Sequence, residues 1–211
     1  MTDSLMTFEG FQNRLNLPKP LLEDFQIYVS LLEKWQKQIN LVSTSTLSDV
    51  WSRHVMDSAQ LYPLIPVGAK KVIDIGSGAG FPGLVLALYF KHYGGPEVHL
   101  VEADGRKCSF LTEVNYRTNA GVIIHAGRAE AMPGLKGDVI TARALAPLRK
   151  LIRMARKFDD GDATYIFLKG AKAREELTDA QKEWTMDIVE TISQTLSIAT
   201  ILTLKGVKHR D

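Results

Sequence analysis

A glycine-rich segment near the middle of the chain constrains the fold more than any other feature. Residues 74–83 read Asp-Ile-Gly-Ser-Gly-Ala-Gly-Phe-Pro-Gly, after the β-branched run 71–73 and before the apolar run 84–88. This is the order strand, glycine loop, helix. Glycines allow positive φ angles and let a ligand lie directly against the main chain. The segment therefore predicts a ligand-binding turn at the end of a first strand.

Dinucleotide-binding enzymes also place a glycine turn here, and Gly78, Gly80 and Gly83 match their G-x-G-x-x-G pattern. Three features argue against that interpretation. The first glycine after the strand is Gly76, so the register is wrong, and Pro82 removes an N–H from the first helical turn. Asp74 would also place a negative charge near a pyrophosphate.

The order acidic-x-Gly-x-Gly-x-Gly instead resembles the main cofactor-binding motif of the Rossmann-like S-adenosylmethionine-dependent methyltransferases. That cofactor has no phosphate, and its sulfonium and amino groups are cationic, which suits Asp74. A second acidic residue is expected to end the second strand and bind the ribose hydroxyls. Glu102 ends the run 98–102, about 20 residues beyond the loop. A glycine turn without a ligand would leave both acidic residues unexplained.

Strand and helix patterns alternate from residue 71 onward. Strands are expected at 71–75, 97–102, 122–126, 138–142 and 163–168, with helices at 83–92, 105–119, 147–158 and 172–184. Two β-rich runs, 187–192 and 198–204, are close enough to be antiparallel neighbours. The pattern predicts an α/β, class I methyltransferase fold with a seven-stranded, mostly parallel sheet.

The first 66 residues have a different, helical pattern. Apolar residues recur at intervals of three and four across 18–40, and 47–62 forms a second, weaker helical stretch. Pro63, Pro66 and Gly68 then indicate a linker. We therefore expect a helical N-terminal extension, 1–66, and a methyltransferase domain, 67–211.

Composition sets limits on compartment and partners. The single cysteine, Cys108, excludes an internal disulfide and a cysteine metal cluster, and it is expected in the core. There is no apolar run long enough to span a membrane and no basic signal-peptide start, so we expect a cytoplasmic protein without membrane attachment. The net charge of +2 does not by itself indicate nucleic-acid binding. His54 and Asp57 lack enough companions for a metal site, and a packing role between the N-terminal helices and the main domain is predicted.

Several separated motifs can be read together. They are Trp35 to Leu41, Arg53 to Ser58, the loop Asp74 to Gly83, Val101-Glu102 with Arg106-Lys107 and Phe110-Leu111, Gly127 to Glu130, Thr141 to Ala144, and Leu168 to Gly170. In this order and spacing they resemble the bacterial small-subunit ribosomal RNA methyltransferase G family, also called glucose-inhibited division protein B. The resemblance spans roughly residues 25–205.

The resemblance implies transfer of a methyl group from S-adenosylmethionine to N7 of one guanine in 16S rRNA, either as RNA or within the small ribosomal subunit. Nothing in the sequence demands more than a monomer. The resemblance places Gly76 and Phe81 against the cofactor, together with Asp74, Gly78 and Gly80 of the loop. Glu102 takes the ribose, Ala129 and Glu130 flank the adenine, and Arg143 lies where cofactor and base meet. An alternative is a methyltransferase of the same fold that acts on a small molecule or a protein, and another is a regulatory nucleotide-binding protein without catalysis.

The chemistry agrees with the residues present. N7 of guanine has a free lone pair, so no general base is required and catalysis is mostly positioning. The Asn/Asp-Pro-Pro-Tyr-like motif of many amine methyltransferases does not occur. Arg143 is expected to have a positioning role, with guanine O6, a phosphate or the cofactor carboxylate as its partner.

A basic stretch follows the fourth strand. From Arg143 to Lys157 there are six basic residues and no acidic one. A helix here would bury Leu148, Leu151, Ile152 and Ala155 and present a cationic outer face, which suits phosphates. The residues expected to contact RNA are Arg53, His54, Arg149, Arg153 and Lys169. A solvated helix face is the alternative.

Overall fold

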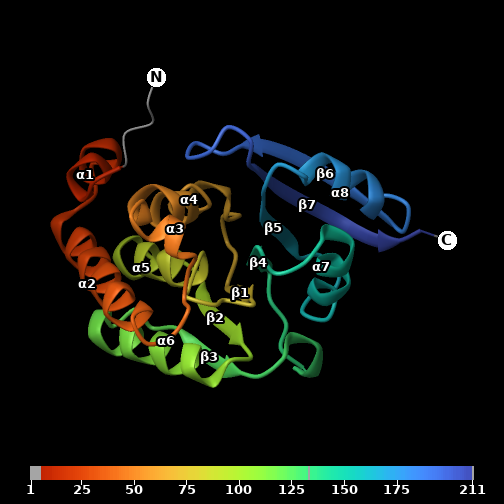
Figure 1. Cartoon of the computed structure of the whole chain (residues 1–211). Coiled ribbons are helices and arrows are strands. Elements are labelled where there is room, and N and C mark those ends of the chain that lie inside the picture. The colour runs from red at the N-terminus through yellow and green to blue at the C-terminus, as the bar shows by residue number, and fades with distance from the viewer. Residues whose placement is uncertain (1–5, 133, 211) are drawn as a thin grey trace.

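The architecture is a single seven-stranded sheet (Figure 1), seen in a computed structural model that describes residues 6–132 and 134–210. The strands are β1 (Lys71–Ile75), β2 (Glu97–Glu102), β3 (Ile123–Ala126), β4 (Val139–Arg143), β5 (Thr164–Lys169), β6 (Trp184–Ile192) and β7 (Thr200–His209). Their order across the sheet is β3-β2-β1-β4-β5-β7-β6. The first five are parallel, and β7 is antiparallel to both β5 and β6. The predicted fold class is confirmed.

Helices follow the parallel strands as the alternation predicted. They are α5 (Gly83–Tyr93), α6 (Gly105–Thr118), α7 (Leu148–Ala155) and α8 (Ala173–Ala180). Successive strand residues point to opposite faces, so Val72 and Leu100 join one apolar cluster while Ile73 and Val101 join another. Two cores therefore form, one on each face of the sheet. No described helix has both the length and the apolar character needed to cross a membrane.

The N-terminal helices share one of these cores. They are α1 (Phe8–Leu15), α2 (Lys19–Gln36), α3 (Thr44–Leu47), the π-helical η1 (Trp51–Met56), α4 (Asp57–Ala59) and the 3₁₀ turn η2 (Tyr62–Leu64). Helix α2 lies along α5 and α6 (Figure 1), and its Leu21 and Phe25 are fully buried in the cluster that contains Leu111 of α6. The residues on the two sides of the expected boundary near residue 66 thus share one hydrophobic core. The division into an N-terminal extension and a methyltransferase domain stays a prediction.

The clearest differences from the expected elements lie at 47–62, at the end of α8 and at the end of β7, which continues to His209 where the expected strand ended at 204. The helical stretch expected at 47–62 is divided among α3, η1, α4 and η2, and its central part has the wider π-helical turn that is often found at functional sites. The helix expected at 172–184 ends at Ala180, and β6 already begins at Trp184. Trp184 already pairs with His209 of β7, so β6 begins earlier than expected, and the buried Trp184 side chain joins the core cluster that contains Leu177 of α8.

The connections create a crevice at the end of β1. From β1 the chain moves outward through β2 to β3, then crosses back to enter β4 on the other side of β1. Ligands in open α/β sheets bind at such a switch point, beyond the carboxyl ends of the strands. The glycine loop follows β1, and Arg143 is the last residue of β4.

Candidate active site

The glycine loop is held in place by its own backbone. The N–H groups of Gly76 and Ser77 donate to the carbonyl of Val101, at 2.9 and 3.1 Å, and so anchor the loop to β2. Gly76 has φ 67° and Gly78 has φ 58°, a region that strongly favours glycine. The N–H of Gly78 donates to Glu102 Oε2 at 2.7 Å. Hydrogen bonds to Val101 and Glu102 thus join the glycine loop to the end of β2.

Asp74 lies beneath the loop and does not line the cavity above it. Its side chain is fully buried; Oδ1 accepts from the Thr141 hydroxyl at 2.8 Å, and Oδ2 accepts from the Gly83 N–H at 3.3 Å. Burial raises the pKa of Asp74 to about 6, against the opposing effect of these hydrogen bonds. The structure therefore differs from the expectation of a direct cofactor contact: Asp74 ties the start of α5 to β4.

Gly80 also supports packing and is not part of the cavity wall. A Cβ at this position would lie 2.5 Å from Leu84 Cδ1 and 2.7 Å from the Tyr28 hydroxyl. That hydroxyl donates to the carbonyl of Ala79, and the Tyr28 ring stacks on Phe81 with centroids 5.2 Å apart. The N-terminal helix α2 thus supports the loop from below.

A cavity of about 490 Å³ opens above the loop. Seven of the nine predicted cofactor residues line it: Gly76, Gly78, Phe81, Glu102, Ala129, Glu130 and Arg143. The sequence interpretation missed Leu41, Lys150 and Met154 as lining residues, because they come from elements far from the loop in sequence. At Gly78 a Cβ would meet nothing closer than 3.8 Å, so the loop leaves open space beside the Glu102 carboxylate. The lining carries two carboxylates, Glu102 and Glu130, and four cationic side chains, Lys107, Arg128, Arg143 and Lys150. A glycine-floored cavity with a carboxylate beside the loop fits a nucleoside cofactor whose ribose hydroxyls donate to that carboxylate.

Leu41 reaches the cavity because the end of α2 is fixed by a side chain. Gln36 Oε1 accepts from the N–H groups of Leu41 and Val42, at 2.9 and 3.0 Å, and its Nε2 donates to the Val42 carbonyl. The turn after α2 is thus held by the side chain of Gln36, the last residue of that helix.

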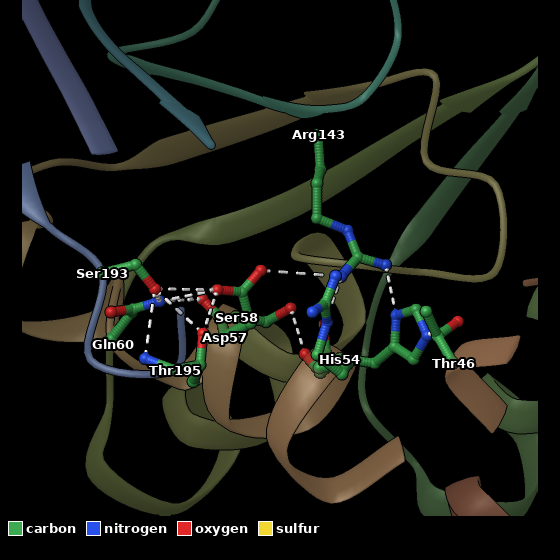
Figure 2. A network of polar contacts seen from close by, with 9 residues as sticks. Thr46, His54, Asp57, Ser58, Gln60, Arg143, Ser193 and Thr195 are labelled. Atoms are coloured by element: carbon green, nitrogen blue, oxygen red, sulfur yellow. Dashed lines mark hydrogen bonds and ion pairs between the residues drawn. The ribbon is translucent and has the colours of Figure 1, made fainter. Parts of the chain in front are cut away.

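Arg143 is clamped by groups from the N-terminal extension (Figure 2). Its Nη1 donates to the carbonyl of Arg53 at 2.9 Å, and its Nη2 donates to His54 Nδ1 at 2.7 Å. Asp57 Oδ2 lies 3.7 Å from Nη1, and the guanidinium carbon lies 5.0 Å from the centroid of the Phe81 ring. The guanidinium is therefore fixed from several sides.

His54 acts as a neutral acceptor in this clamp. Burial, and then the nearby charges of Arg143 and Arg53, lower the pKa of His54 to about 3. Because a guanidinium can only donate, Nδ1 must accept and Nε2 carries the proton. Nε2 then donates to the Thr46 hydroxyl, 2.8 Å away. Both ring nitrogens are occupied, so His54 is not available as a general base.

Asp57 connects the clamp to the far end of the chain (Figure 2). Its Oδ1 accepts from Gln60 Nε2 at 2.9 Å, from the Thr195 hydroxyl at 2.7 Å and from the Ser193 hydroxyl at 3.2 Å. Ser193 and Thr195 belong to the segment between β6 and β7. The predicted packing role of His54 and Asp57, joining the N-terminal helices to the main domain, is confirmed, and the partners from residues 193–195 are new.

A second cavity, of about 680 Å³, adjoins the first. The two share Leu41 and the segment 143–146, and Ala144 in that segment has φ 50°, an uncommon conformation for a residue with a Cβ. Arg53, His54 and Lys169, three of the predicted RNA-contacting residues, line the second cavity. Arg143 thus stands in the wall between a cavity floored by the glycine loop and one lined by cationic and polar side chains.

The basic face of α7 is partly neutralised by one carboxylate. Arg149 Nε lies 2.5 Å and Arg153 Nη2 lies 2.6 Å from Glu183 Oε2, and hydrogen bonds from Arg153 and Arg149 lower the pKa of Glu183 to about 2. The buried face is as predicted, with Leu148, Leu151, Ile152 and Ala155 in the core. Arg149 and Arg153 line neither cavity, so their contact with RNA stays a prediction.

Comparison with known sequences identifies the protein family to which this chain belongs. A model of the rRNA small subunit methyltransferase G family matches residues 21–201. The chain belongs to this family. A ribosomal RNA small subunit methyltransferase G from Rhodospirillum rubrum is 46% identical over 205 residues, covering 97% of this chain and 100% of that protein. One from Caulobacter vibrioides is 40% identical over 185 residues, covering 88% and 85%. The resemblance inferred from the motifs is confirmed.

Solved structures agree with this rRNA small subunit methyltransferase G assignment at the level of fold. An O-methyltransferase from Bacillus cereus in complex with SAH superposes with a TM-score of 0.60 at 15% identity, covering 97% of this chain and 100% of that chain. M. jannaschii TYW2 in complex with AdoMet gives a TM-score of 0.56 at 15% identity, covering 76% and 78%. The likeness confirms the predicted fold, and membership of the rRNA small subunit methyltransferase G family identifies the chain as an S-adenosylmethionine-dependent methyltransferase.

Proposed function

We propose that this methyltransferase G family member methylates N7 of one guanosine in 16S rRNA within the small ribosomal subunit. The observation that carries the proposal is the pair of adjoining cavities that meet at Arg143. One suits the cofactor, and the other admits a base from the opposite side. The relatives' name, ribosomal RNA small subunit methyltransferase, supports rRNA as the substrate.

The residues suit a reaction that needs no proton removed. S-adenosylmethionine supplies a methyl group on a sulfonium, which is a good leaving group. N7 of guanine attacks with an in-plane lone pair, so positioning supplies most of the rate enhancement. Among the described residues that line the two cavities, His54 is the sole histidine, and its hydrogen bonds and low pKa keep it from acting as a base.

Arg143 has a positioning role in this proposal. Its clamp fixes the plane of the guanidinium, so the N–H groups not used by Arg53 and His54 keep a constant direction. A fixed cation at this junction favours guanine O6, a phosphate or the cofactor carboxylate. Arg53, His54 and Lys169 extend the polar wall on the RNA side, and Arg149 and Arg153 would contact phosphates further out on α7. The ribosomal substrate and the single, buried Cys108 support a cytoplasmic enzyme, which we propose acts as a monomer.

The test is methyl transfer from labelled S-adenosylmethionine to small subunits isolated from a strain without this gene, followed by nucleoside analysis. The expected product is 7-methylguanosine at a single rRNA position. Label on another atom of RNA, or on protein only, contradicts the proposal. Arg143→Ala should abolish transfer, while Arg117→Ala, at an exposed ion pair on α6, serves as the matched control and should not.

A further inference from the structure

A lysine and a glutamate in the second cavity lie side by side, away from the glycine loop. Lys169 is the last residue of β5, and Glu176 lies in the first half of α8. Lys169 Nζ and Glu176 Oε2 are 2.6 Å apart, with side-chain exposures of 7% and 23%. Both residues line the second cavity and neither lines the first. The pair therefore faces the space that the proposed function assigns to the substrate.

Each member of the pair has unused hydrogen-bonding capacity. A lysine ammonium has three donors; Nζ of Lys169 uses one toward Glu176 and one toward the carbonyl of Ala146, at 2.9 Å. Oε2 of Glu176 also accepts from the Leu148 N–H at 2.7 Å, whereas Oε1 accepts no hydrogen bond from any described residue. One N–H donor and one carboxylate acceptor are thus available next to each other.

Guanine has the complementary arrangement. Along its Watson–Crick edge the acceptor O6 is followed by the donors N1–H and N2–H₂, while adenine presents a donor at position 6 followed by an acceptor at N1. We propose that Glu176 and Lys169 read the Watson–Crick edge of the target guanine, Oε1 of Glu176 accepting from both N1–H and N2–H₂ through its two lone pairs and Lys169 donating to O6. This inference rests on the proposed function and names its specificity-determining residues. It requires an unpaired base, as is usual for enzymes that modify a base in RNA.

This mode of binding turns N7 of the guanine toward the cofactor cavity. In guanine, O6 lies between N1 and N7. Lys169 is bonded to Ala146, which belongs to the wall shared by the two cavities. A base with O6 on Lys169 and N1 on Glu176 therefore turns N7 toward that wall and the cofactor cavity.

Glu176 is also the carboxylate best placed to stabilise the reaction. The guanine ring gains a positive charge when N7 is methylated, and a carboxylate on the opposite edge stabilises that charge more in the transition state than in the ground state. Asp57, another carboxylate of this cavity, is already engaged by Gln60, Ser193, Thr195 and Arg143. Oδ2 of Asp57 lies 3.7 Å from Arg143 Nη1, on the side of the clamp, whereas Oε1 of Glu176 accepts no hydrogen bond from any described residue.

The experiment compares guanosine with inosine, which lacks only the 2-amino group. Small subunits are reconstituted with either nucleoside at the methylated position, and kcat/KM is measured for wild type, Glu176→Gln and Glu175→Gln. Glutamine can keep an acceptor for Leu148 but turns N–H groups toward the base. Since one good base contact contributes about 1–3 kcal/mol, wild type should prefer guanosine by roughly tenfold. Glu176→Gln should lose roughly tenfold or more on guanosine, and its guanosine-to-inosine ratio should approach one.

The controls separate recognition from folding. Glu175→Gln changes the exposed neighbour on the same helix and should retain the wild-type ratio. Binding of S-adenosylhomocysteine by Glu176→Gln should be unchanged, and Glu176→Asp should recover part of the preference. Equal rates on guanosine and inosine with wild type, or a wild-type ratio in Glu176→Gln, overturn the inference alone. The first of these needs no variant and decides the matter even if Glu176→Gln fails to fold. Absence of transfer to N7 by wild type overturns the proposed function and this inference together.

Discussion

The two glycines at the start of the loop provide a matched test of how the loop is built. Gly76→Ala and Gly78→Ala introduce the same methyl group at φ 67° and φ 58°, so both pay a similar backbone strain. Their surroundings differ. A Cβ at Gly76 would lie 2.5 Å from Leu145 Cδ1 and 2.9 Å from Leu145 Cδ2, whereas a Cβ at Gly78 meets nothing closer than 3.8 Å.

The magnitudes follow from these distances. Left-handed backbone at a residue with a Cβ costs about 1–2 kcal/mol, which is the whole expected loss of unfolding free energy for Gly78→Ala. Gly76→Ala must also displace Leu145, and such overpacking adds about 1–3 kcal/mol. For a chain of this size, 1 kcal/mol lowers Tm by roughly 2–4 °C. Gly76→Ala should therefore melt roughly 2–12 °C below Gly78→Ala.

The assay combines thermal unfolding with titration of S-adenosylhomocysteine. In Gly78→Ala the methyl group projects into the open part of the cofactor cavity, so its affinity should fall more than its stability. In Gly76→Ala both should fall, because Leu145 lines the same cavity. Equal Tm values for the two variants would refute the steric argument. Unchanged cofactor affinity in Gly78→Ala would refute the position assigned to the cofactor.

Three further outcomes are expected. Arg143→Lys, which cannot reproduce both fixed N–H bonds, should lower kcat by roughly 10- to 100-fold in steady-state methyl transfer while S-adenosylhomocysteine affinity changes less. Asp57→Asn removes the charge opposite Arg143 and should also lower kcat; the double variant should lose less than the sum of the two, as measured in a double-mutant cycle. Asp74 has a folded pKa of about 6, raised from 3.8, so the folded state binds the extra proton and its stability falls as pH rises through that interval. The loss is about 3 kcal/mol between pH ~4 and ~7, and urea unfolding of Asp74→Asn should lack it.

Local sequence signals predicted the sheet and most of the cofactor cavity. Gly76, Gly78 and Glu102 could be placed because a glycine turn and a strand-ending acid occupy fixed positions within one strand–loop–helix unit. Arg143 could be placed because the ends of β1 and β4 meet at the switch point. The parallel register of these strands then fixes where their last side chains lie.

The parts that could not be predicted depend on residues far apart in the chain. Ser193 reaches Asp57 across 136 positions, and Glu183 reaches Arg153 across 30. No periodicity in either segment indicates such a pairing. Asp74 was misplaced for a related reason: its position at the strand end suggests a ligand, but the hydroxyl of Thr141 on the neighbouring strand already holds it. Glu183, which neutralises part of the charge on α7, lies outside the basic stretch 143–157. The residues of that stretch alone therefore led to an overestimate of its unpaired positive charge.

The order of strands at one edge of the sheet determines when the clamp around Arg143 is completed during synthesis. β6 is translated before β7 but pairs only with β7, which is the strand that joins β5. The sheet therefore cannot grow by adding strands in the order in which they are made, and the β6–β7 hairpin must dock onto β5 as a unit. Docking also brings Ser193 and Thr195 to Asp57, and through it fixes Arg143. Before the hairpin docks, the chain can thus form the glycine loop and the contacts of Arg143 with Arg53 and His54, but Asp57 lacks the hydroxyls of Ser193 and Thr195 that complete the clamp.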